Sequence, residues 1–187
     1  MQEKFNNQEV SDQNEPQGLT EEEIERIIEE SRDAVLPFYD EIEKLRMANP
    51  KREVGGRIVK GKMQLFDVSR WEKDGVVGES YEEERRLAEE GVLSFHSHPA
   101  GSSPRESGQD ILTAYCRFRE VIFHDGGVTL LIALTRLSAE RIEEINKQEW
   151  QQAQEDDEKY GNDAFGCWQA SLRKKLPLRV VKIVDKK

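Results

Sequence analysis

The stretch FHSHPAGSSPRESGQD, residues 95–110, places two histidines two positions apart, directly before a proline and a loop of small and polar residues. His96 and His98 are two of only three histidines in the 187-residue chain. The segment VLSFHSH, residues 92–98, alternates as a strand does, so both histidines project from one face. Pro99 ends this strand. The two imidazoles therefore lie at its exposed end, where they can bind one metal ion.

A candidate third ligand follows the loop, in the motif S-x-x-D formed by Ser107 and Asp110. Ser107 can cap a helix, and the helix dipole favours a carboxylate in the first turn. The motif could be a capping pair alone, but capping and metal binding are compatible. If a short return loop carries this turn over the strand end, His96, His98 and Asp110 bind zinc and leave a fourth position for water. That pattern is typical of a catalytic zinc site.

A zinc-activated water needs a base, and many carboxylates of the chain could serve on spacing alone. We single out Glu53, because it begins a predicted strand and precedes Gly55-Gly56, where another backbone segment can approach closely. If that strand neighbours the histidine strand, Glu53 reaches the water from the side opposite the metal. The alternative is a solvated acid at the start of a strand.

These residues together resemble the JAMM (JAB/MPN) family of zinc metalloproteases, in its prokaryotic form. The resemblance rests on the HSHP and S-x-x-D motifs and on Glu53, which precedes His96 by 43 residues. It covers roughly residues 35–135. An isolated H-x-H pair is a weak signal, whereas the full combination is specific to this family.

The resemblance implies one zinc ion per chain and five site residues: the ligands His96, His98 and Asp110, the general base Glu53, and Ser107, which stabilises the oxyanion. The interval between His98 and Ser107 is one residue longer than is usual in the family. A loop can absorb this residue. Ser102 and Ser103 lie in the same loop and remain alternatives to Ser107.

The fold implied by the resemblance is an α/β sandwich of the JAMM/MPN type, with a curved mixed sheet flanked by helices and an extra helical region before the last strand. The implied activity is zinc-dependent cleavage of the amide bond after the C-terminal glycine of a ubiquitin-like or sulfur-carrier-type protein. That carrier, with its glycine-terminated tail, is the implied partner. Both isopeptide deconjugation and precursor processing fit.

Two alternatives belong to other functional classes. Metal-free members of the family act as non-catalytic scaffolds, which the intact set of site residues disfavours. RadC-like proteins associated with DNA repair share the H-x-H-P motif, but the acidic balance of the chain and its lack of a basic patch argue against them.

The net charge of −10 is unevenly distributed. Residues 1–50 contain 5 basic and 14 acidic residues, a balance of −9, and the other 137 contain 23 and 24, a balance of −1. This argues against nucleic acid as the main partner. No segment approaches the roughly 18–20 apolar residues of a membrane span, and the N-terminus lacks the apolar centre of a signal peptide. We expect a cytoplasmic protein with no membrane partner, and leave its oligomeric state open.

The chain should form a disordered acidic tail over residues 1–18 and a single domain over 19–187. Predicted helices span 20–49 with a break at Pro37, 81–90, 107–118 and 138–175 with a break near Gly161. Predicted strands lie in 53–71 around a turn at 60–62, in 92–98, in 121–135 around a turn at 125–127, and in 178–184. Residues 71–80 should form a loop.

Several residues have structural interpretations. His124 in HDGG is expected to be an exposed turn residue. Cys116 and Cys167 are expected to be buried thiols, because they are far apart and form no C-x-x-C pair. Cys116 lies in a helical pattern and has no partner base, which favours the core over a nucleophile. The aromatic residues of 138–175 are expected to pack on the chain's own sheet.

Overall fold

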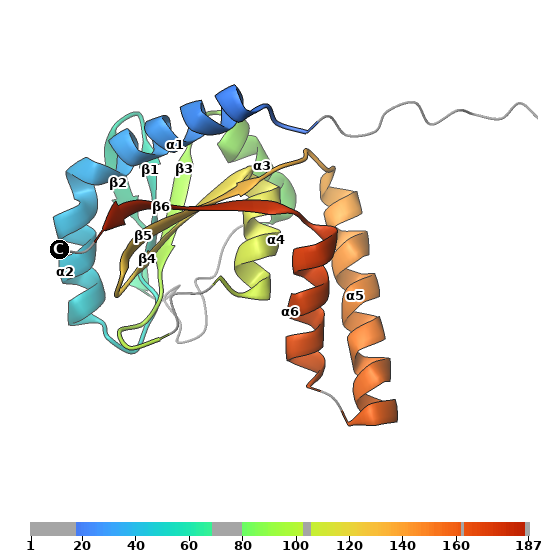
Figure 1. Ribbon diagram of the computed structural model, residues 1–187. Helices are drawn as coiled ribbons and strands as arrows, with labels where there is room; N and C mark the ends of the chain where they lie inside the picture. Colours follow the sequence, from blue (N-terminus) through green and yellow to red (C-terminus); the bar gives the residue numbers. More distant parts are fainter. Residues whose placement is uncertain (1–17, 69–79, 103–105, 162, 186–187) are drawn as a thin grey trace, which may run out of the picture.

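Short apolar segments of the chain pair into one sheet in the computed structural model, which describes residues 18–68, 80–102, 106–161 and 163–185 (Figure 1). Within these residues the sheet has six strands in the order β2-β1-β3-β4-β5-β6. Strands β3 and β4 are parallel, and every other neighbouring pair is antiparallel. The predicted mixed sheet is therefore confirmed, with strands β1 (Gly55–Val59), β2 (Lys62–Leu65), β3 (Leu93–Ser97), β4 (Arg119–His124), β5 (Gly127–Ala133) and β6 (Leu178–Asp185).

Helices cover both faces of this sheet (Figure 1). One face carries the N-terminal helices, and the other carries α4 with α3 beside it and the pair α5 and α6 at its outer side. The helices are α1 (Glu21–Val35), the 3-10 turn η1 (Leu36–Phe38), α2 (Tyr39–Ala48), α3 (Tyr81–Glu89), α4 (Gly108–Arg117), α5 (Ala139–Tyr160) and α6 (Ala164–Lys175). Within the described ranges, no helix is both long enough and apolar enough to cross a membrane.

Side-chain alternation along the central strands divides the core into two layers. Val121 and Phe123 of β4 join the cluster that α1 and α2 cover, which also contains Phe95 of β3. Ile122, between them, packs with Ala114 of α4 on the other face. Since His96 is paired with Ile122 in the parallel register, both histidines belong to the α4 face.

Local sequence signals set most of the element boundaries. Thr20 forms the expected capping box with Glu23 at the start of α1. Pro37 divides the first helix through η1. Lys60 and Gly61 both have positive φ, 50° and 72°, as in the type I′ turns that are common in two-residue hairpins. The long C-terminal helical region breaks at Gly161, which adopts the left-handed conformation.

One strand boundary differs from the prediction by more than two residues. The second strand of the first hairpin ends at Leu65 instead of continuing towards residue 71. The predicted tail lies outside the described residues except for Gly18, which forms an isolated bridge with Thr135. Most of the predicted loop 71–80 also lies outside the described residues.

The first hairpin lies close against the histidine strand because of Gly56. A Cβ at Gly56 would lie 2.7 Å from the ring of Phe95 and 2.7 Å from the carbonyl oxygen of Gln64. Any side chain there would push β1 away from β3. This glycine therefore meets the expected close approach of two backbone segments, and it keeps the segment that begins at Glu53 beside the histidines.

The helices α5 and α6 pack on each other and mainly on α4, and their cluster also includes Ala133 of β5, so the expectation that they pack on the chain's own sheet is met only in part (Figure 1). Trp168 is buried in a cluster with Ile111 and Tyr115 of α4. A Cβ at Gly108 would lie 2.5 Å from the Trp168 ring, so the indole lies directly on the first turn of α4. The helix α4 already covers that part of the sheet, so the hairpin formed by α5 and α6 packs against the outer side of α4.

We predict that Trp168→Ala lowers the free energy of unfolding by about 3–5 kcal/mol, because it removes a large side chain from a packed cluster. Trp168 is 8% exposed, whereas Trp150 on the same hairpin is 38% exposed and serves as the matched control. Urea unfolding of both variants checks this, and Trp150→Ala should lose much less. An unchanged unfolding midpoint for Trp168→Ala would show that the indole is a surface group instead.

Candidate metal centre

The two histidines leave the sheet at the end of β3, on the face that α4 covers. The backbone N–H of His98 donates to the carbonyl of Phe123 at 2.8 Å, which extends the pairing of β3 with β4 by one residue. Both histidines are nearly buried, at 8% exposed for His96 and 7% for His98. The strand thus holds both imidazoles at fixed positions under the start of α4.

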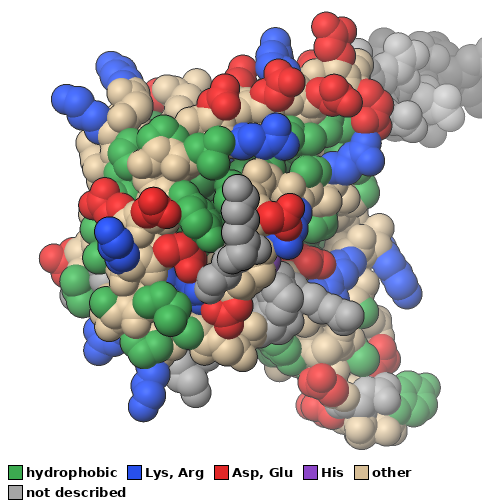
Figure 2. Space-filling view, turned by 60° about the vertical axis from the view of Figure 1, so that its left-hand side comes forward, with side chains coloured by type: hydrophobic (Ala, Val, Ile, Leu, Met, Phe, Trp, Pro, Cys, Tyr) green, Lys and Arg blue, Asp and Glu red, His purple; other side chains and the backbone are tan. Residues whose placement is uncertain are grey.

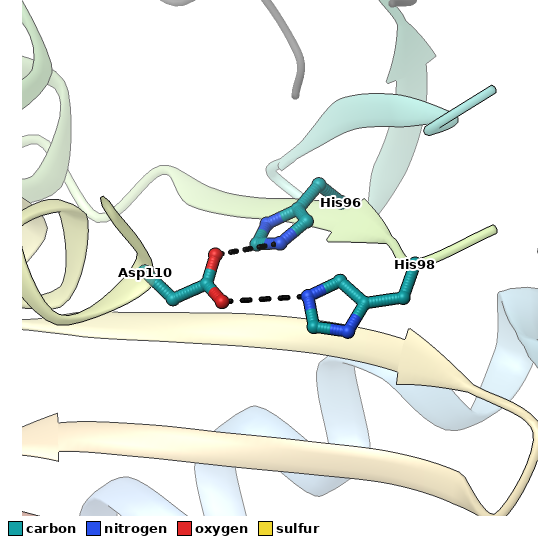
Figure 3. A group of neighbouring side chains, drawn as sticks. All are labelled: His96, His98 and Asp110. Carbon is teal, nitrogen blue, oxygen red and sulfur yellow. Dashed lines mark ion pairs between the residues drawn. The ribbon is translucent and has the colours of Figure 1, made fainter. Parts of the chain in front are cut away.

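Asp110 approaches the histidines from the first turn of α4 (Figure 3). Its Oδ1 lies 3.0 Å from Nε2 of His96, and its Oδ2 lies 3.4 Å from Nε2 of His98. One ligand atom from each of the three side chains lies within 4.8 Å of the others. The structure therefore brings together the three residues that the sequence predicts as metal ligands, and among the described residues they form the one such group.

The start of α4 is fixed by a reciprocal capping box. The backbone N–H of Asp110 donates to Oγ of Ser107 at 3.1 Å, and the backbone N–H of Ser107 donates to Oδ2 of Asp110 at 2.5 Å. Ser102, an alternative to Ser107, donates its hydroxyl to the carbonyl of Pro99 at 2.6 Å. Ser103 lies outside the described residues. Of the two described serines, only Ser107 hydrogen-bonds to a metal-ligand candidate in the structure.

The loop that follows His98 is connected, through Asp125, to the buried side chain of Arg46 on the opposite side of the sheet. The backbone N–H of Gly101 donates to Oδ2 of Asp125 at 2.7 Å. Oδ1 of Asp125 accepts at 2.8 Å from Nη1 of Arg46, whose side chain is fully buried in α2. The turn between β4 and β5 thus links α2 to the chain just beyond the histidines.

The donor set fits a zinc ion. Two imidazole nitrogens and one carboxylate, all buried and convergent, are the ligand types of three-residue catalytic zinc sites. Burial lowers the pKa of His96, but the carboxylates of Asp110 and Glu120 outweigh burial and hold that pKa well above its usual range. Burial raises the pKa of Asp110, but the two histidines outweigh it and place that pKa below its usual range. The local field therefore favours positive charge at this point.

Glu120 is a site residue that the sequence analysis did not identify. Its Oε1 lies 2.8 Å from Nδ1 of His96, and its side chain is fully buried on β4. The partner that aligns a metal-binding histidine through its second nitrogen is commonly a carboxylate. A signal was present in the sequence, since Glu120 is an acid directly before the apolar run 121–123 of the strand REVIFH.

A chain of buried ion pairs continues from Glu120 to the surface of the sheet. Nη1 of Arg117 lies 2.7 Å from Oε2 of Glu120, and its Nε lies 2.9 Å from Oε2 of Glu84 in α3. Oε1 of Glu84 lies 3.1 Å from Nη2 of Arg57 on β1. Burial lowers the pKa of Arg117, but its two glutamate partners outweigh burial and raise it. Arg117 therefore remains charged between two carboxylates.

Glu53 is placed beside the site by the pairing of β1 with β3. Gly55 pairs with His96, and the next pair is joined by hydrogen bonds from Ser97 N to the Val54 carbonyl, at 2.8 Å, and from Val54 N to Ser97 Oγ, at 3.0 Å. Continuing this register by one pair places Glu53 opposite His98. Glu53 is half-buried and lies outside the three-ligand group. The predicted adjacency of the two strands is confirmed.

The prediction that His124 is an exposed turn residue is wrong, because its side chain is buried at the end of β4. Its Nδ1 accepts from Gly126 N at 3.0 Å, so Nε2 carries the proton and donates to Oγ1 of Thr129 at 2.8 Å. Burial, followed by the nearby charge of His98, lowers the pKa of His124. Both ring nitrogens are engaged, which separates His124 from the metal-ligand candidates.

The cysteines differ in their environments. Cys116 is buried in α4 beside Tyr115, as predicted, and burial raises the pKa of its thiol to about 12. A thiol with that pKa is protonated at neutral pH and is a poor nucleophile. Cys167 is half-buried instead of buried.

The outer surface carries both signs of charge. Figure 2 shows acidic and basic side chains interspersed over one face of the molecule, with apolar side chains gathered in patches between them.

The chain matches no model of a known protein family, no curated protein and no solved structure.

We predict about one zinc ion per chain, bound by His96, His98 and Asp110. The double change His96→Ala and His98→Ala should abolish binding, because it removes two of three ligands. His124→Gln is the matched control, since it alters the third histidine of the chain outside the group, and it should keep the metal. Elemental analysis of protein purified without chelator checks this. Absence of metal, with none taken up from added zinc, would contradict the assignment.

Proposed function

We propose that this protein is a zinc-dependent amide hydrolase of the JAMM type. The observation that carries the proposal is the convergence of His96, His98 and Asp110 at the end of β3, with three ligand atoms within 4.8 Å of one another. A capped helix start and a glutamate opposite His98 in the extended strand register complete the set that the sequence motifs predict.

The proposed substrate is the amide bond after the C-terminal glycine of a ubiquitin-like or sulfur-carrier-type protein. This part of the proposal rests on the resemblance of the HSHP and S-x-x-D motifs and Glu53 to the JAMM family. A bond that joins the glycine to a lysine of another protein, and a bond that joins it to a short tail, present the same amide to the site.

When bound, zinc would polarise the scissile carbonyl and lower the pKa of a water towards about 7. His96, His98 and Asp110 would hold the ion. Glu53 would accept the proton of the attacking water and deliver it to the leaving amine, acting first as general base and then as general acid. Its position opposite His98 supports this role, because it flanks the ligand set without belonging to it.

Ser107 has a hydroxyl suited to the developing oxyanion. Its Oγ already accepts from the backbone N–H of Asp110 at 3.1 Å, and a hydroxyl that accepts one bond can still donate its own proton. The capping bond fixes the oxygen one turn from the metal ligand. A donor that is held in place before the reaction stabilises charge that develops in the transition state.

Cleavage of a carrier fusion tests the proposed function. Ubiquitin-like and sulfur-carrier proteins that end in glycine are presented with a short C-terminal tail in one arm and with an isopeptide-linked lysine in the other. We expect cleavage after the glycine in at least one arm, its loss with a chelator, and its return with zinc. Carriers that bind the zinc-loaded protein but stay intact would indicate a non-catalytic scaffold instead.

We predict that Glu53→Gln keeps the fold and the metal but slows cleavage by about 10²–10⁴-fold, because it removes the proton acceptor. The substitution keeps the shape of the side chain. Glu41→Gln, at an exposed position of α2, is the matched control and should cleave at the wild-type rate. Single-turnover rates on the fusion substrate, together with metal content, check this. A Glu53→Gln rate near the wild-type rate would assign the base to another residue.

A further inference from the structure

We propose that Glu120 is a positioning residue of the metal centre, which fixes the tautomer and ring orientation of His96. This inference rests on the proposed metal site and deepens it. The observation that carries it is the contact of 2.8 Å between Oε1 of Glu120 and Nδ1 of His96, on the side of the ring opposite Asp110.

The geometry assigns one role to each ring nitrogen of His96. Nε2 faces Asp110 at 3.0 Å, where the ligand atoms converge, and Nδ1 faces Glu120. A carboxylate only accepts hydrogen bonds, so Nδ1 carries the proton and Nε2 presents its lone pair to the metal. A ring turned by 180° would present Cδ2–H to Glu120 and lose this hydrogen bond, and the other tautomer would set the Nδ1 lone pair against a carboxylate oxygen.

Glu120 is itself held in position. Its side chain is fully buried, and its second oxygen, Oε2, is 2.7 Å from Nη1 of Arg117. Arg117 is in turn 2.9 Å from Glu84. One oxygen of Glu120 is therefore committed to Arg117 and the other to His96, which leaves the carboxylate little freedom to rotate.

The carboxylate also changes the strength of the ligand. A negative group that accepts from Nδ1–H makes the imidazole a better donor at Nε2, and loss of such a partner typically lowers metal affinity by about 10–100-fold. Glu84 shares Arg117 with Glu120, but it lies on α3 and its other ion pair is with Arg57 on β1. The two glutamates thus separate an effect on the ligand from an effect on the buried ion pairs.

Zinc affinity measured by competition with a chromogenic chelator tests the inference. We expect Glu120→Gln, which keeps the shape but removes the charge, to raise the dissociation constant for zinc about 10–100-fold. Glu84→Gln is the matched control, because it also removes a partner of Arg117. It should lower the melting temperature and leave the dissociation constant within the scatter of the wild-type value. Equal affinities for wild type and Glu120→Gln, or equal losses in both variants, would overturn the inference.

A second measurement uses the unaltered protein and holds even if Glu120→Gln fails to fold. Nitrogen-15 spectra of the zinc-loaded chain contain the signals of only three imidazoles. The signals that disappear in His124→Gln are those of His124. We expect His96 to show a protonated, slowly exchanging Nδ1 and a metal-bound Nε2. Zinc on Nδ1 would overturn the inference while leaving the metal site intact. A wild-type chain that binds no zinc would overturn both this inference and the proposed function.

Discussion

The carboxylate of Asp110 joins the start of α4 to the two histidines of the metal-ligand group. It closes the capping box at the start of α4 through the backbone N–H of Ser107, and it lies against the Nε2 atoms of His96 and His98. An acid at the third helical position is favoured both by the free N–H groups of the first turn and by the helix dipole. The same preference that begins the helix therefore aims the acid at the histidines, so the site and the fold share one constraint.

Burying so many charges demands that each be paired, because an isolated ion in a protein interior is strongly destabilising. The structure meets this demand by alternating signs from His96 through Glu120 and Arg117 to Glu84. The series begins at a metal-ligand candidate and includes residues of β4, α4 and α3. Buried ion pairs are weak evidence for stability. Their arrangement here is better explained by the need to hold one imidazole in one orientation.

The sequence was informative where local chemistry decides the outcome. The turn at Lys60-Gly61 and the break at Gly161 follow from backbone conformations that few residues adopt. The three candidate metal ligands follow from strand alternation and from a capping motif. The predicted adjacency of the Glu53 segment and the histidine strand is confirmed by the pairing of β1 with β3.

What the sequence could not supply depends on packing between distant elements. Glu120 contacts His96 across 24 positions of the chain, and an acid beside an apolar strand indicates a buried charge without identifying its partner. The Asp-Gly-Gly run after His124 predicted a turn residue, but His124 is buried at the end of β4. The hairpin of α5 and α6 packs mainly on α4, which the sequence does not indicate, because amphipathic spacing reveals an apolar face without identifying the surface that this face covers.

The contact between Gly108 and Trp168 makes the helical hairpin part of the wall behind the site. The indole rests on the turn that carries Asp110, and Arg173 of α6 adds a hydrogen bond of 2.8 Å to the carbonyl of Glu106. If α6 opens locally, this turn loses its cover. The hairpin and the first turn of α4 should then form one unit of local unfolding, visible as matched rates of amide hydrogen exchange. A metal ion bound by His96, His98 and Asp110 would then slow amide hydrogen exchange in α6, although α6 supplies none of these ligands.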